Sequence, residues 1–166
     1  NTPYDCGIVI CKHRDTLVSA MQASGSYILY SDKRDGMLYS ADMSRRSRAV
    51  ELWATLKLLG REGVEALVDG LCERAAQFAE RIQQEGYTVF NEVAFNQVLV
   101  ACASADETAA TLNALQNSGE CWCGAGKWHD TLLIRVSVCS WVTDEADIER
   151  TVAAFVEARK TAAKQA

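Results

Sequence analysis

The 166-residue sequence contains a single proline and only two histidines. With 49% apolar residues, it has the composition of a folded chain with a sizeable core and not of a disordered segment. No apolar run approaches membrane-spanning length and no leader-like segment is recognisable, so we expect no membrane partner. The formal net charge of −5 argues against a nucleic-acid partner held through its phosphates.

The seven cysteines form no recognisable framework. Cys121 and Cys123 are separated by one residue, a spacing that suits neither a zinc knuckle nor a redox CxxC motif. We therefore expect reduced, mostly buried thiols and no metal site, which is typical of a cytoplasmic protein.

The spacing of residues in the sequence does not by itself identify a set of catalytic side chains. His13 lies in a KHRD turn and His129 in a KWHD turn, and for both we expect a surface role. The glycines of CGAGK do not have the GxxxxGK[ST] pattern of a phosphate-binding loop.

The sequence does not begin with methionine, and residues 7–11 (GIVIC) leave no polar side chain on either face of a strand. This pattern is typical of a central strand with neighbours on both sides, so we expect the polypeptide to begin upstream of Asn1. Helical spacing follows over 14–22. Periodicity is then lost over residues 23–43, a length typical of a binding loop or of a plain surface excursion.

A helix is predicted from Ser44, as N-cap, to Gly60, which is placed to end it. Its first turn would hold Arg45, Arg46 and Arg48, at the end of the helix dipole that disfavours cations. Either these arginines pair with surface carboxylates, or they face a phosphate or carboxylate together with the helix N-terminus.

The remaining pattern predicts a long helix followed by an α+β unit with a mixed or antiparallel sheet. A further helix should begin after Thr143 as cap. The predicted elements before it are helices over 62–85 and 106–117 and strands over 87–90, 97–103, 120–123 and 132–139.

Arg135 lies in the middle of the predicted strand LLIRVSVC. Period two places it on one face with Leu133 and Ser137, opposite Ile134 and Val136. A buried guanidinium there needs an anion, either an internal carboxylate or the carboxylate of a substrate or cofactor.

Three segments together resemble the C-terminal part of group II pyridoxal-phosphate-dependent decarboxylases, the family of the aromatic-amino-acid, histidine and glutamate decarboxylases. They are NTPYDCG before an apolar strand, MSRRSRAVELWATLKLLGREG, and W-x-G ahead of LLIRVSVCSWVTDEADIER. The resemblance implies an α/β chain, the C-terminal portion of a fold-type-I enzyme. Residues 1–43 would end the large cofactor-binding domain with a strand, a helix and a mobile loop. Residues 44–166 would form the small domain, with two long helices and then the α+β unit.

The resemblance also implies a pyridoxal 5′-phosphate (PLP) cofactor, bound mainly by an N-terminal part of the same enzyme. The lysine that holds PLP as a Schiff base would lie just upstream of Asn1. The expected substrate is an amino acid, the reaction a decarboxylation, and the assembly a cytoplasmic homodimer. The present chain alone would be inactive.

By the same resemblance, Arg135 is the group nearest the substrate carboxylate, and the backbone of Met43 and Ser44 approaches the partner subunit's cofactor. The family's mobile loop carries a tyrosine that donates a proton. The loop here is shorter and departs from the family pattern, so Tyr27, Tyr30 and Tyr39 are equal candidates.

Two alternatives remain open at this point. Because the loop departs from the pattern, the reaction could instead be an aminotransfer or an oxidative deamination, which differ from decarboxylation in where a proton is placed. Alternatively, the residues from Tyr87 onward could form an ACT-like ligand-binding module without catalysis. Such a module requires neither the central strand nor the long preceding helices that are predicted here.

Overall fold

The computed structural model describes residue 2, residue 4 and residues 6–165. The chain divides into two compact units, Thr2–Leu58 and Leu59–Ala166. The family resemblance places the boundary between the large and the small domain of the whole enzyme between residues 43 and 44. That boundary stays a prediction. Within the described part of the chain, none of the helices combines the length and apolar character needed to cross a bilayer.

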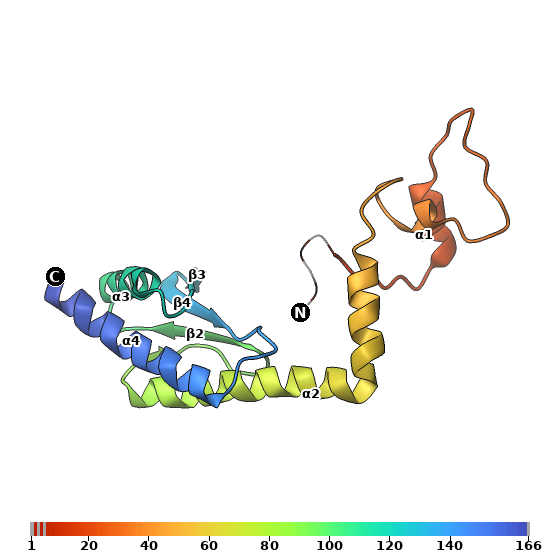
Figure 1. Ribbon diagram of the computed structural model, residues 1–166. Helices are drawn as coiled ribbons and strands as arrows, with labels where there is room; N and C mark the ends of the chain where they lie inside the picture. Colours follow the sequence, from red (N-terminus) through yellow and green to blue (C-terminus); the bar gives the residue numbers. More distant parts are fainter. Residues whose placement is uncertain (1, 3, 5, 166) are drawn as a thin grey trace. The chain divides into compact units, whose positions relative to one another are not determined.

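The N-terminal unit contains the helix α1 (Arg14–Met21), the 3₁₀ helix η1 (Gly36–Tyr39) and the beginning of α2 (Ala49–Gln84) (Figure 1). The helix predicted over 14–22 is therefore confirmed. The segment between α1 and α2 is loop apart from η1, as the loss of periodicity predicts.

The strand expected over residues 7–11 is not formed, which corrects that prediction. These residues carry neither helix nor strand, and Ile8, Val9 and Ile10 are 60%, 83% and 95% exposed. The physical reason is that a strand exists only when it is paired, and no other described segment pairs with this one.

Helix α2 begins at Ala49 and not next to Ser44, which is a second correction. The three arginines therefore precede the helix and do not lie in its first turn. Gly60 has φ 64° and ψ −170°, a conformation almost restricted to glycine, and it interrupts α2 as predicted. Helical structure resumes directly after it and continues to Gln84, before Gly86 at φ 79°.

The C-terminal unit contains a four-stranded antiparallel sheet in the order β1-β2-β4-β3. Its strands are β1 (Thr88–Val89), β2 (Gln97–Ala101), β3 (Gly124–Trp128) and β4 (Thr131–Ser137). No strand forms over 120–123, so that prediction is wrong, and the strand comes at Gly124–Trp128 instead. A tight turn joins β3 to β4 through His129 and Asp130, both at positive φ.

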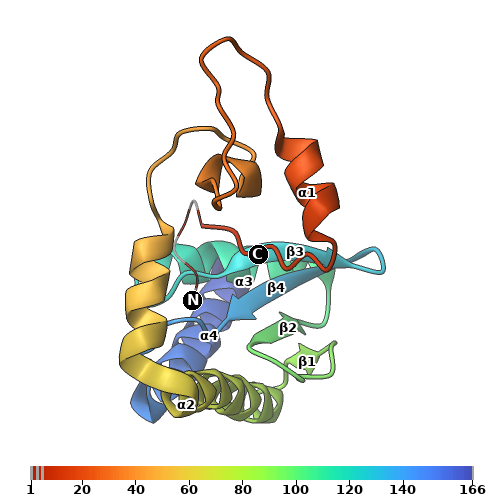
Figure 2. The same ribbon diagram turned by 90° about the vertical axis from the view of Figure 1, so that its right-hand side faces the viewer.

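Three helical segments cover one face of this sheet. In both views α4 (Glu145–Gln165) lies between α3 (Ala105–Ser118) and the C-terminal part of α2 (Figures 1 and 2). Phe78 of α2 and Phe155 of α4 are fully buried, and their rings meet edge to face at 5.4 Å. The antiparallel α+β unit predicted from the sequence is thus confirmed.

Helix α4 is capped differently from the prediction. Asp144, and not Thr143, makes the reciprocal pair with Asp147: the Asp147 amide donates to Asp144 Oδ1 (3.0 Å), and the Asp144 amide donates to Asp147 Oδ2 (3.1 Å). This arrangement satisfies two amide donors at the helix start and places negative charge where the helix dipole favours it.

Candidate functional site

Arg135 lies at the centre of the sheet. In the strand register it pairs with Leu99 of β2 on one side and Gly124 of β3 on the other. Its strand neighbours Ile134 and Val136 are buried beneath the helices, whereas Arg135 is exposed on the opposite face. Ile134, Arg135 and Val136 thus alternate in burial as predicted, whereas Leu133, predicted on the same face as Arg135, is fully buried. The guanidinium lies on an exposed part of the face opposite Ile134 and Val136.

Two glycines of β3 leave the space beside Arg135 open. A Cβ atom added at Gly124 would lie 3.9 Å from Arg135 Nη2, and one added at Gly126 would lie 3.8 Å from Arg135 Cβ. The long arginine side chain can lie across β3 because no side chain stands there. In the sequence these glycines belong to CGAGK and were considered only as a phosphate-binding loop, although period two in GAGKW also places them on one face.

No carboxylate of the described residues forms an ion pair or hydrogen bond with Arg135. Within the described part of the chain, the internal-carboxylate alternative therefore has no partner to support it. An exposed guanidinium with all its donors available can bind a planar carboxylate with two parallel hydrogen bonds.

The three candidate tyrosines have different environments. The Tyr39 hydroxyl accepts a hydrogen bond from Arg14 Nε at 2.7 Å, and the Arg34 guanidinium lies 4.5 Å from its ring centre. The Tyr30 hydroxyl closes the loop on Ala23, accepting from its amide at 2.9 Å and donating to its carbonyl at 2.5 Å.

Tyr27 is 80% exposed, and its hydroxyl bonds to no described residue. The structure therefore places Tyr30 and Tyr39 in structural contacts and leaves Tyr27 as the one candidate whose hydroxyl is available. Which tyrosine acts in catalysis stays a prediction.

Met43 and Ser44 lie in the exposed loop before α2, and no described residue hydrogen-bonds to their backbone. An exposed loop with free amides suits a contact with another molecule. The arginines that follow line a cavity of about 390 Å³, together with the start of α2. Arg45 pairs with Asp42 at 3.7 Å, as the surface-carboxylate interpretation predicts.

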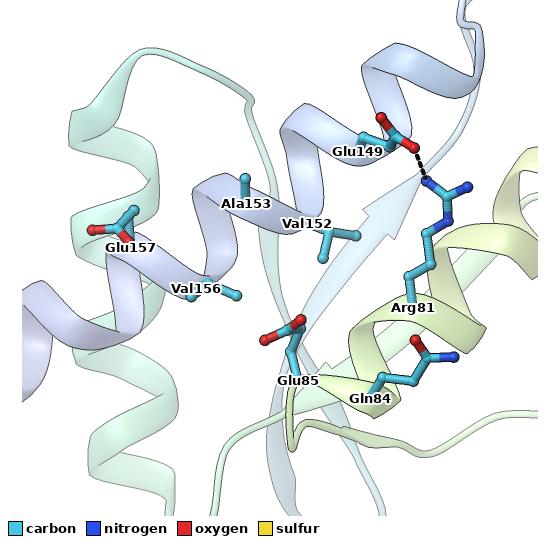
Figure 3. A pocket seen from close by; sticks show the side chains of 8 residues that line it. All are labelled: Arg81, Gln84, Glu85, Glu149, Val152, Ala153, Val156 and Glu157. Carbon is cyan, nitrogen blue, oxygen red and sulfur yellow. Dashed lines mark hydrogen bonds and ion pairs between the residues drawn. The ribbon is translucent and has the colours of Figure 1, made fainter.

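A separate groove of about 490 Å³ lies between α2 and α4 (Figure 3). Its one guanidinium, that of Arg81, already pairs with Glu145 at 2.7 Å and Glu149 at 3.0 Å. Glu85 and Glu157 add further negative charge to the walls. This groove is therefore unsuited to an amino-acid carboxylate, unlike the exposed face around Arg135.

The pyridoxal-dependent decarboxylase conserved domain matches residues 2–102, more than half of the sequence, and the chain belongs to this family. Family membership decides against a stand-alone ligand-binding module. The aromatic-L-amino-acid decarboxylase of Drosophila lebanonensis is 27% identical over 151 residues, which is 88% of this chain and 38% of that protein. The aspartate 1-decarboxylase of Aliivibrio fischeri is 32% identical over 83 residues, covering 50% of this chain and 15% of its own length.

Solved structures show the same fold. The tryptophan decarboxylase of Catharanthus roseus, in complex with L-tryptophan, superposes on 87% of this chain with a TM-score of 0.74 at 16% identity. The 4-hydroxyphenylacetaldehyde synthase of Rhodiola rosea covers 89% of the chain with a TM-score of 0.76, also at 16% identity. The chain spans about a third of these proteins, 33% and 32%. The expected fold class, a portion of a PLP-decarboxylase fold, is confirmed.

Proposed function

We propose that this chain is the C-terminal part of a PLP-dependent amino-acid decarboxylase in which Arg135 binds the substrate carboxylate. The observation that carries this proposal is the unpaired, exposed guanidinium on the open face of the sheet, in a chain that belongs to the pyridoxal-dependent decarboxylase family. The complete enzyme would be a cytoplasmic homodimer.

PLP, when bound, supplies an electron sink for the bond that is broken at the amino-acid α-carbon. This chain orients the substrate and donates a proton. Arg135 fixes the carboxylate end of the substrate through its fork of donors. Met43 and Ser44 offer free backbone amides towards the partner subunit's cofactor, and Tyr27 offers a hydroxyl for proton donation.

The residues present fit this role only in part. Every lysine of the chain is exposed, so the described residues offer no enclosed amine to hold the cofactor. This agrees with a cofactor site built mainly by the N-terminal part of the enzyme. The chain supplies the substrate side of the site and a loop directed towards the neighbouring subunit.

The proposal is tested by replacing Arg135 in the complete enzyme. Arg135→Met removes a charge-assisted, two-pronged contact and should lower kcat/KM by about 2–4 kcal/mol of transition-state stabilisation, roughly 30- to 1,000-fold. Arg135→Lys keeps the charge but loses the forked geometry. Its kcat/KM should therefore still fall, although less than that of Arg135→Met. The melting temperature should change little, because no described residue depends on this guanidinium.

A matched control is Arg150→Met, which removes another exposed arginine, paired on the surface with Asp147 at 3.4 Å. It should leave kcat/KM near the wild-type value. A melting temperature that collapses in Arg135→Met while kcat/KM stays normal would mean that Arg135 is structural in the complete enzyme, and the substrate role would be wrong.

A further inference from the structure

The segment before β3 brings two thiols to one cavity. Cys121 and Cys123 flank Trp122 in a segment without helix or strand. Trp122 is 80% exposed, Cys121 is half-buried, and Cys123 is 3% exposed. Both cysteines are thus less exposed than Trp122, and both line a cavity of about 330 Å³ beside β4 and the start of α4.

The backbone at this pair is held in place. Gln116 of α3 donates from Nε2 to the Cys123 carbonyl at 2.7 Å, and Gly124 directly afterwards begins β3. Cys123 is thus fixed on its C-terminal side, whereas Cys121 lies in a segment without helix or strand. The backbone is therefore held at Cys123, whereas no described hydrogen bond holds it at Cys121.

The two thiols differ in acidity. Interaction with the neighbouring Cys123 thiol holds the pKa of Cys121 below its usual value, although burial opposes this. The same interaction, together with burial, raises the pKa of Cys123. Cys121 is therefore the thiol that forms the nucleophilic thiolate more readily, with a protonated thiol beside it.

We propose that Cys121 and Cys123 are a peroxide-reactive thiol pair that closes to a reversible disulfide. The Cys121 thiolate attacks one oxygen of hydrogen peroxide, which breaks the O–O bond and gives a sulfenic acid and hydroxide. The Cys123 sulfur then attacks the Cys121 sulfur, a disulfide forms, and the sulfenic oxygen leaves as water with the Cys123 proton. Peroxide is the oxidant, reduced in all by two electrons that come from the two sulfurs.

Geometry makes this disulfide easy to reduce. In an extended chain the Cβ atoms of residues i and i+2 lie about 6.6 Å apart, beyond the roughly 4 Å that a disulfide spans, so the backbone must bend for the bond to form. Closing the bond therefore strains the segment, and strained disulfides are the labile ones. Cys102 should be less reactive than Cys121. It is buried, its thiol donates a hydrogen bond to the Thr111 hydroxyl at 3.5 Å, and burial raises its pKa.

The test uses the complete PLP-loaded protein, reduced and then treated with hydrogen peroxide. Remaining thiols are labelled with N-ethylmaleimide after denaturation, and the protein is cut after acidic and basic residues to release the peptide CWCGAGK, residues 121–127. We expect this peptide to carry no maleimide and to be lighter by two hydrogen atoms, whereas Cys102 stays labelled. A thiol reductant added before labelling should restore both maleimides.

Two variants identify the roles of the thiols. Cys123→Ser should stop the reaction at a sulfenic acid on Cys121, which dimedone traps, and Cys121→Ser should leave Cys123 fully labelled after peroxide. Cys139→Ser removes the third thiol of the same cavity and should leave the result unchanged. Maleimide on both Cys121 and Cys123 after peroxide, or a Cys121–Cys139 disulfide, would overturn the proposal. Neither outcome depends on decarboxylase activity, so failure here is separate from failure of the proposed function.

Discussion

Arg159 connects three parts of the C-terminal unit through a single side chain. Its Nε donates to Glu107 of α3 at 2.6 Å, its Nη1 donates to the Gly86 carbonyl at 3.1 Å, and its guanidinium lies 5.1 Å from the Tyr87 ring centre. The Tyr87 hydroxyl in turn donates to the Phe155 carbonyl at 2.8 Å in the core. An ion pair that is about 30% exposed and embedded in such a network contributes more than an isolated surface pair.

Replacing Glu107 measures this contribution. Glu107→Gln keeps the shape but removes the charge, and it should lower the free energy of unfolding by about 1 kcal/mol at neutral pH. The hydrogen bond from Arg159 holds the pKa of Glu107 below its ordinary value of 4.5. A lowered folded pKa adds stability that is fully present above pH 4.5 and is lost as the pH falls through the folded pKa.

The two proteins should therefore differ in their urea midpoints at neutral pH and converge below pH 4.5. Glu157→Gln is the matched control, since Glu157 pairs with Lys160 at 2.7 Å on an exposed face of α4 and should be nearly neutral. A difference between wild type and Glu107→Gln that persists undiminished in acid would contradict the electrostatic account.

At the scale of elements, Gly60 and Gly70 of α2 give a matched pair. Gly60 has a backbone conformation that a side chain tolerates badly, so Gly60→Ala should lower the free energy of unfolding by about 1–3 kcal/mol. Gly70 has helical geometry with open space around its Cβ position, so Gly70→Ala should raise it by about 0.5–1 kcal/mol. Chemical denaturation of both variants checks the prediction. Equal effects of the same sign would mean that the interruption at Gly60 is not set by its φ angle.

Periodicity made most elements predictable, and the failures have physical causes. The apolar faces of α2, α3 and α4 recur at helical spacing, and β4 alternates around Arg135, so these elements follow from local pattern. Strand β3 was missed because GAGKW has low β propensity, and pairing with β4 supplies what the residues lack. Residues 7–11 have the opposite property: their propensity is high, but no described strand pairs with them.

The candidate site was predictable to the same extent. The mid-strand position and face of Arg135 followed from period two, but the absence of a partner among the described residues did not, because an ion pair joins residues far apart in sequence. The tyrosines could not be ranked from sequence since Tyr30 and Tyr39 are distinguished from Tyr27 only by tertiary hydrogen bonds. The cap of α4 was misplaced by one residue because Thr143 and Asp144 are both good caps.

For the whole molecule, the positions of the lysines define a prediction about the cofactor. Every lysine of the chain is exposed, as expected for turns, loops and solvated helix faces. Residues 1–166 alone should therefore show no Schiff-base absorbance that survives dialysis after incubation with PLP. A stable band that disappears when one lysine is replaced would mean that the chain holds the cofactor by itself.

The exposed apolar segment over residues 7–11 predicts how the isolated chain behaves. Val9 and Ile10 are 83% and 95% exposed, and their backbone pairs with no described strand, which are the conditions for pairing between chains. Residues 1–166 alone should therefore self-associate in light scattering, and a Val9→Ser, Ile10→Ser variant should associate less. Leu29→Ser, which removes one exposed apolar side chain of the loop, serves as control. A monomer of residues 1–166 that is stable on dilution would contradict this account.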